Sequence, residues 1–137
     1  MAELVVKAEV ENLDDVFDFI HEQLESFDCS PKIMMQIDLS VDEIFANISN
    51  YAYNPEIGDA KIVCNVEKDP LRVEITFEDG GIPFDPLAKA DPDVTLSAED
   101  RQIGGLGVYL VKKNMDSVDY KYENGKNILT IKKEIGD

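Results

Sequence analysis

The segment Glu78-Asp79-Gly80-Gly81-Ile82-Pro83-Phe84-Asp85 marks the sharpest change of character in the chain. Residues 71–78, which lead into it, alternate apolar and polar side chains and predict a half-buried strand. Residues 79–105 contain three prolines and many acids, and a loop of this length in a compact domain is usually functional. The glycines permit a sharp turn and a close approach to a flat ligand. Asp79 could accept a hydrogen bond from an exocyclic amine, although a simple Asx turn uses the same residues.

Outward from this segment, the hydrophobic periodicity predicts seven further elements. Further strands are expected at residues 3–10, 60–67, 117–123 and 127–134, and helices at residues 13–27, 31–53 and 106–115. Because helices and strands do not alternate regularly, we predict an α+β fold. Its architecture would be a two-layer sandwich, with a mostly antiparallel sheet and the helices on one face. The length favours a single domain over residues 1–137.

Local signals set the ends of these elements. Ser30-Pro31 predicts an N-cap followed by proline in the first helical turn. Asn12 or an adjacent aspartate is expected to cap the preceding helix. Asn54-Pro55 is expected to end the long helix, and Asn124-Gly125 is a strong hairpin turn. The expected core stripe of the long helix steps by three or four residues: Met34, Ile37, Val41, Ile44, Ile48 and Ala52.

The composition excludes several classes of function. The chain has 137 residues and a formal net charge of −16, which would repel a nucleic-acid backbone or an anionic membrane surface. A small anionic ligand is not excluded, because backbone N–H groups or a metal could neutralise it locally. Cys29 and Cys64 predict reduced thiols in a cytoplasmic protein, and a single histidine, His21, excludes a zinc site built by the protein. Neither a membrane span nor a signal peptide is expected.

Two more constellations could carry chemistry. Glu43 and Asn47 lie four residues apart, on one face of the expected long helix, where they could bind Mg²⁺ or activate a hydroxyl. An ordinary solvated helix pair has the same spacing. Gly104-Gly105-Leu106-Gly107 precedes a helix, where exposed N–H groups suit a phosphate, although a glycine hinge is the simpler interpretation.

Taken together and in order, these three motifs resemble the N, G1 and G2 boxes of the GHKL ATP-binding superfamily. The nearest subgroup is the anti-sigma-factor serine/threonine kinases. The resemblance implies an ATP and Mg²⁺ site between the long helix, the sheet and an ATP lid at about residues 85–104. Glu43 would be the general base, and Asn47 would coordinate Mg²⁺, with Asn50 near the phosphates.

The resemblance also assigns the remaining nucleotide contacts. Asp79 would bind the adenine amine, and Gly81 would allow its close approach. The phosphates would lie against Gly105, Leu106 and Gly107. Arg101 would reach the γ-phosphate, unless it is a surface arginine. The family often has a Gly-Thr-like pair entering its last strand. This chain has Gly125-Lys126-Asn127, so the resemblance implies that Asn127 would replace the threonine hydroxyl in binding the nucleotide.

The function implied is an Mg-ATP-dependent serine/threonine protein kinase of anti-sigma type. It would phosphorylate an anti-sigma-antagonist of the STAS type, sequester a sigma factor, or do both. The alternative is an ATP- or ADP-gated interaction module with negligible phosphotransfer. A third interpretation is an α+β domain with coincidental motifs. The family also implies a homodimer, with the first strand and helix as the candidate surface. Residues 1–30 contain nine acids and one base, which suits a basic protein partner.

Overall fold

The alternating segments form one antiparallel sheet of five strands in the order β1-β2-β3-β5-β4. The computed structural model describes residues 1–53, 58–68, 70–83 and 105–136. The strands are β1 (Ala2–Lys7), β2 (Asp59–Glu67), β3 (Arg72–Asp79), β4 (Ser117–Glu123) and β5 (Lys126–Glu134). Each neighbouring pair in the sheet is antiparallel. The predicted α+β class and the mostly antiparallel sheet are therefore confirmed.

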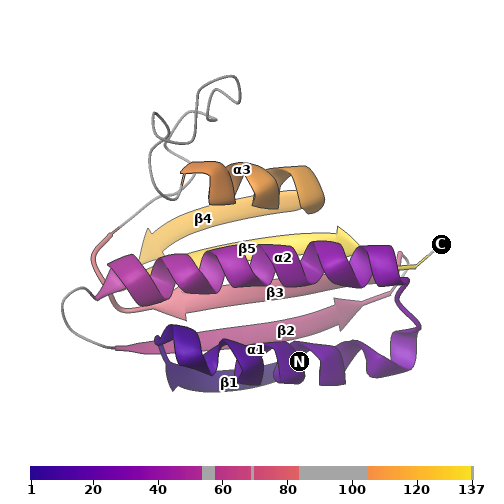
Figure 1. Cartoon of the computed structure of the whole chain (residues 1–137), viewed down its shortest axis with the longest axis horizontal. Helices are drawn as coiled ribbons and strands as arrows, with labels where there is room; N and C mark the ends of the chain where they lie inside the picture. Colours follow the sequence, from indigo (N-terminus) through magenta and orange to yellow (C-terminus); the bar gives the residue numbers. More distant parts are fainter. Residues whose placement is uncertain (54–57, 69, 84–104, 137) are drawn as a thin grey trace.

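The helices cover a single face of this sheet. They are α1 (Leu13–Leu24), α2 (Pro31–Asn47) and α3 (Gly105–Asn114). In Figure 1 all three lie in front of the sheet, with α2 running between α1 and α3. The protein thus has the two layers expected from the sequence. No helix within the described residues is long and apolar enough to cross a membrane.

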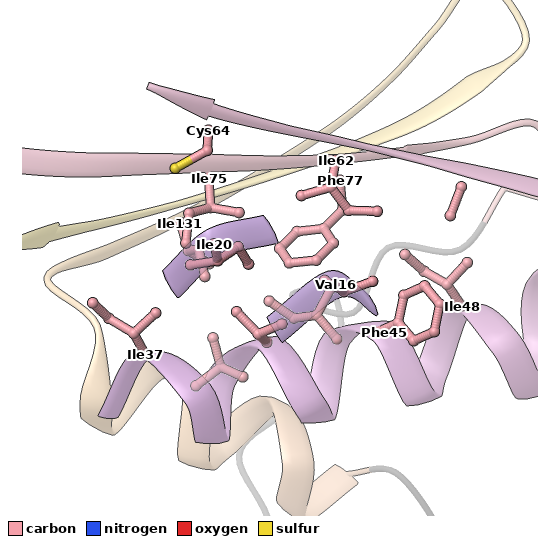
Figure 2. Packing of buried hydrophobic residues seen from close by; sticks show 14 of the residues in the cluster. Val16, Ile20, Ile37, Phe45, Ile48, Ile62, Cys64, Ile75, Phe77 and Ile131 are labelled. Atoms are coloured by element: carbon pink, nitrogen blue, oxygen red, sulfur yellow. The ribbon is translucent and has the colours of Figure 1, made fainter. Parts of the chain in front are cut away.

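The core lies between the two layers. Val16 and Ile20 of α1 and Ile37 of α2 meet side chains from three strands there (Figure 2). The sheet contributes the buried side chains of Ile62, Cys64, Val73, Ile75, Phe77 and Ile131. The predicted stripe of the long helix is buried from Ile37 to Ala52, and Met34 at its start is partly buried. Phe45 lies outside that stripe and is also fully buried, as part of the same hydrophobic core.

Two of the predicted local signals are confirmed. Ser30 is the N-cap of α2, with its Oγ accepting a hydrogen bond from the N–H of Ile33 at 3.2 Å, and Pro31 opens the helix. Asn124 and Gly125 both have positive φ, 54° and 77°, as a tight turn between twisted antiparallel strands requires. The turn signal at Asn54-Pro55 lies outside the described residues.

Three other predictions need correction. The first strand ends at Lys7 rather than residue 10, because the chain turns into a short 3₁₀ helix, η1 (Val10–Asn12). Asn12 precedes α1 but makes no capping bond. Its amide instead donates to the carbonyl of Lys7, at 2.9 Å. The expected helix at 13–27 finishes as a second 3₁₀ turn, η2 (Glu25–Phe27).

The long helix also changes type before its end. After Asn47 it continues as one π-helical turn, η3 (Ile48–Ala52), instead of as an α-helix to Tyr53. A π-turn is wider than an α-turn and therefore rotates the residues that follow it about the axis. Single π-turns within helices occur frequently at functional sites.

Candidate functional site

Several elements that carry predicted site residues begin or end on the same side of the molecule. The C-terminal end of α2, the end of β3, the start of β5 and the start of α3 all lie at the left of Figure 1. The antiparallel pairing places the start of β5 beside the end of β3. The elements that carry the three sequence motifs therefore have these ends on one side of the molecule.

Asp79 and Asn127 are brought together by the register of the sheet. They are direct partners across β3 and β5, so their side chains point to the same face. The Asn127 Nδ2 group donates to Asp79 Oδ1 at 2.9 Å, and the N–H of Gly81 donates to the same oxygen at 3.0 Å. Both side chains are buried, each only 6% exposed. Within the described part of the chain, both of these N–H donors bond to Oδ1, so Oδ2 is the carboxylate oxygen that a ligand can engage.

Asn127 also bonds to groups outside β3. Its Nδ2 group also donates to the carbonyl of Ile82, at 2.8 Å. Its Oδ1 accepts a short hydrogen bond from the hydroxyl of Tyr120 on β4. The residue at the threonine position of the family thus bonds to the Asp79 carboxylate and to the turn that follows it.

The turn after β3 is anchored to the end of the long helix. The N–H of Ile82 donates to the carbonyl of Ala52 at 3.0 Å. A Cβ added at Gly81 would lie only 2.1 Å from that same carbonyl oxygen. Gly81 is therefore required by the protein's own packing, in addition to any approach of a ligand.

Tyr53 supports the same turn from the other side. Its hydroxyl accepts a hydrogen bond from the N–H of Gly80 at 2.7 Å and donates one to the carbonyl of Asp59 at 2.6 Å. Burial is the main cause that raises the pKa of the Tyr53 phenol, so the hydroxyl stays protonated at neutral pH. The turn is consequently held to both the helix end and the start of β2.

Glu43, Asn47 and Asn50 lie along the C-terminal half of the long helix. Glu43 and Asn47 are half-buried and one turn apart on α2, whereas Asn50 is exposed on the π-turn. Burial, and secondly the charge of Asp42, raise the pKa of the Glu43 carboxyl. A carboxylate with a raised pKa holds a proton more readily, which suits a general base.

The third motif opens α3. The helix begins at Gly105, so Gly105, Leu106 and Gly107 form its first turn. The N–H groups of a first turn have no partners within their own helix and carry the positive end of the helix dipole. Helix α3 packs against α2, which carries Glu43 and Asn47. Arg101 and the predicted lid at 85–104 lie outside the described residues.

A magnesium ion at this site would need ligands from the nucleotide. The described residues contain no group of three or more His, Cys, Asp or Glu side chains that could hold a metal. Mg²⁺ in phosphoryl-transfer sites is commonly held by one or two protein oxygens together with phosphate oxygens and water. The side-chain oxygen of Asn47 fits that requirement.

Sequence reasoning missed three contributors to this site: Tyr120, Tyr53 and the carbonyl of Ala52. Each acts through a partner distant in the sequence, and pairing those partners requires the sheet order. Asn127, in contrast, is predicted by the family resemblance. It also falls at an inward-facing position of an alternating strand, where a polar side chain needs a buried partner.

Comparison with known proteins assigns the family. Residues 6–133 match the family described as the histidine kinase-like ATPase domain. The chain belongs to this family. The predicted GHKL resemblance, made from three short motifs, is therefore confirmed.

The chain is also similar to curated proteins named as serine-protein kinases. The chain is 31% identical over 98 residues to the serine-protein kinase RsbW of Bacillus cereus (strain AH187), covering 69% of this chain and 60% of that protein. It is 29% identical over 103 residues to RsbW of Bacillus mycoides, covering 72% of this chain and 63% of the relative. The match thus spans less than two thirds of the length of these relatives.

Solved structures agree on the fold. The RsbU and RsbW domains of a Mycobacterium tuberculosis protein align with a TM-score of 0.66 at 13% identity, covering 98% of this chain and 33% of that chain. The histidine kinase domain of a blue-light activated kinase from Erythrobacter litoralis aligns with a TM-score of 0.55 at 15% identity, covering 92% of this chain and 60% of that chain. At these identities the likeness concerns the fold alone.

Proposed function

We propose that this protein is an Mg-ATP-dependent serine/threonine protein kinase of the anti-sigma regulatory type. The observation that carries the proposal is the Asp79 carboxylate, held at the end of β3 by Asn127 and Gly81, in a chain of the histidine kinase-like ATPase family. The similarity to RsbW serine-protein kinases supports transfer to a protein hydroxyl.

Asp79 would recognise the adenine base. Its Oδ1 already accepts two N–H groups, so Oδ2 would accept the 6-amino group of the base. A buried carboxylate at the edge of a sheet selects for a donor, because a ligand that presents an acceptor leaves the charge unpaired. This contact would fix the nucleoside end of ATP.

The phosphates would extend from Asp79 toward the two helices. The N–H groups of Gly105, Leu106 and Gly107 would accept the phosphate charge at the start of α3, with Arg101 and Asn50 as further candidate contacts. Asn47 would hold Mg²⁺ by its side-chain oxygen. When bound, Mg²⁺ neutralises phosphate charge and orients the terminal group for in-line attack.

Glu43 would act on the incoming hydroxyl. Its carboxylate accepts the proton from a serine or threonine hydroxyl of the partner, while the hydroxyl oxygen bonds to the γ-phosphorus. The bond from that phosphorus to the bridging oxygen breaks, and ADP leaves with the electron pair. The raised pKa of Glu43 makes it a stronger proton acceptor than an ordinary surface glutamate.

The partner would be a STAS-type anti-sigma-antagonist, a sigma factor, or both. The acidic residues of the first 30 positions support a partner with a basic surface. Among the described strands, β1 is one edge of the sheet, and Val5 on it is 60% exposed. This exposed edge is where we propose that a homodimer would form, through the first strand and helix. A cytoplasmic location stays a prediction.

Phosphotransfer tests the proposal. The protein is incubated with γ-labelled ATP, Mg²⁺ and a STAS-domain protein encoded in the same genome, and label on the partner is followed over time. We expect transfer by the wild type, and a loss of about 100-fold or more in Glu43→Gln because the base is removed. Asp42→Asn, which alters the neighbouring acid, is the matched control and should retain most of the activity.

The outcomes separate the two candidate functions. Wild-type transfer that persists unchanged in Glu43→Gln would refute the general-base assignment. ADP binding with no transfer to any STAS-domain protein of that genome would favour the nucleotide-gated interaction module over the kinase.

A further inference from the structure

Three side chains on three strands form a continuous hydrogen-bonded chain. Tyr120 on β4 donates to Asn127 on β5, and Asn127 donates to Asp79 on β3. The register explains their reach, since Asp79 lies directly opposite Asn127 and Tyr120 lies diagonally from it. The chain runs from a strand at the edge of the sheet to the carboxylate proposed to contact adenine.

The partners fix the orientation of the Asn127 amide. Its nitrogen faces two groups that can only accept, the Asp79 carboxylate and the Ile82 carbonyl. Rotating the amide by half a turn would place its oxygen against both acceptors and its nitrogen against the Tyr120 hydroxyl. Tyr120, by donating to Asn127 Oδ1, stabilises the orientation in which both Nδ2 hydrogens are used.

This arrangement also fixes the Asp79 carboxylate. Two N–H donors, from Asn127 and Gly81, meet at Oδ1 and hold the plane of the carboxylate. Asn127 additionally ties the carbonyl of Ile82, so the carboxylate and the following turn move together. Without these donors the plane of the carboxylate could rotate, and its free oxygen would no longer point in one fixed direction toward the base.

We propose that Asn127 and Tyr120 are positioning residues that set the selectivity of this site for a 6-aminopurine over a 6-oxopurine. The inference rests on the proposed nucleotide site and adds to it the residues that orient its acceptor. Asn127 acts through Asp79 without touching the base, and Tyr120 acts through Asn127.

The test compares two ligands that differ at the 6-position. The dissociation constants of Mg-ADP and Mg-IDP are measured by calorimetry for the wild type and Tyr120→Phe. Loss of one hydroxyl should weaken ADP binding about three- to tenfold, the worth of one hydrogen bond, while IDP binding stays the same or improves. A purely structural role for Tyr120 would weaken both ligands equally.

Tyr122→Phe is the matched control. Tyr122 lies on the same strand and is 46% exposed, so loss of its hydroxyl should leave the ADP to IDP ratio unchanged. Asn127→Asp is a stronger test, because it sets a third acceptor against Asp79 and Ile82. Its folding is checked by circular dichroism. Tyr120→Phe serves as the conservative variant if Asn127→Asp does not fold.

The same titrations distinguish a failure of the positioning role from a failure of the proposed nucleotide site. A wild type that prefers ADP, together with a Tyr120→Phe variant that keeps the same ratio, would overturn the positioning role alone. A wild type that binds neither nucleotide would overturn both proposals.

Discussion

At the scale of single residues, the protein's own packing leaves no room for a side chain at Gly81, whether or not a ligand approaches it. Its missing Cβ would overlap the carbonyl oxygen of Ala52 at 2.1 Å, and backbone atoms cannot move aside cheaply. We expect Gly81→Ala to lower the free energy of unfolding by about 1–3 kcal/mol, as overpacking does elsewhere. Urea denaturation without nucleotide measures this cost.

Gly80 supplies the matched control for that substitution. Among the described residues, a Cβ there would meet only the Tyr53 hydroxyl, at an ordinary 3.7 Å. Gly80→Ala should therefore change the free energy of unfolding by less than about 0.5 kcal/mol. Equal effects at the two glycines would contradict the packing account of Gly81.

Glu43 should oppose folding slightly when it is ionised. Its pKa is raised in the folded protein, first by burial and then by Asp42, so the fold favours the protonated carboxyl. The stability that this preference contributes is present below the unfolded-state pKa and is lost as the pH rises through the folded-state pKa. At neutral pH, Glu43→Gln should therefore raise the free energy of unfolding, by about 0.5 kcal/mol or less because the site is partly solvated.

A pH series of thermal melts checks this expectation. The advantage of Glu43→Gln over the wild type should shrink as the pH is lowered through the pKa of Glu43. The wild-type phosphotransfer rate should fall over the same range, because a protonated base cannot accept a proton. A Glu43→Gln variant that is less stable than the wild type at neutral pH would show that the carboxylate has a structural partner.

The residues of the candidate site differ in how far the sequence could predict them. Asp79 was assigned from its place at the end of a strand, and the structure brings it together with Asn127 and Gly81. The roles of Tyr120 and Tyr53 depend on strand pairing, because their partners lie 7 and 27 residues away along the chain. Periodicity identifies faces of elements and carries no information about which strands are neighbours.

At the scale of elements, the start of α2 rests on one side-chain contact. Ser30 Oγ accepts the N–H of Ile33, one of the helix donors that lacks a partner within the helix. Ser30→Ala should lower the free energy of unfolding by about 1 kcal/mol. Ser26→Ala, an exposed serine in η2, is the control and should have little effect. Equal losses in both variants would show that the cap contributes nothing specific.

Element types were predictable where the periodicity was strong, and their ends were not. All five strands and three helices occur near their expected positions. The π-turn at Ile48–Ala52 has no sequence signal of its own, since its apolar spacing also fits an α-helix. The π-turn ends at Ala52, whose carbonyl accepts a hydrogen bond from the N–H of Ile82. Local propensity does not encode this tertiary contact.

At the scale of the whole molecule, the sheet order brings together residues of the proposed site that are distant in the sequence. Asp79 and Asn127 are 48 residues apart in sequence and adjacent across β3 and β5. The net charge of −16 does not prevent phosphate binding in the proposed account, because helix N–H groups and Mg²⁺ would neutralise the phosphates locally. Nucleotide recognition by the proposed site therefore depends most on whether Asp79 engages the base.

Exchange of Asp79 for asparagine tests that claim directly. Gly81 and Asn127 both donate to Oδ1, so the carbonyl oxygen of an asparagine would take that position and its NH₂ group would replace Oδ2. The 6-amino group of adenine, a donor, would then face the NH₂ group, which is also a donor. The 6-oxo group of hypoxanthine would instead accept a hydrogen bond from that NH₂ group.

The measurement is calorimetric titration of the wild type and Asp79→Asn with Mg-ADP and Mg-IDP. The wild type should bind ADP more tightly than IDP. Asp79→Asn should lose about tenfold or more in ADP affinity and bind IDP more tightly than ADP. An Asp79→Asn variant that folds and keeps the wild-type preference for ADP would contradict the adenine-binding role of Asp79.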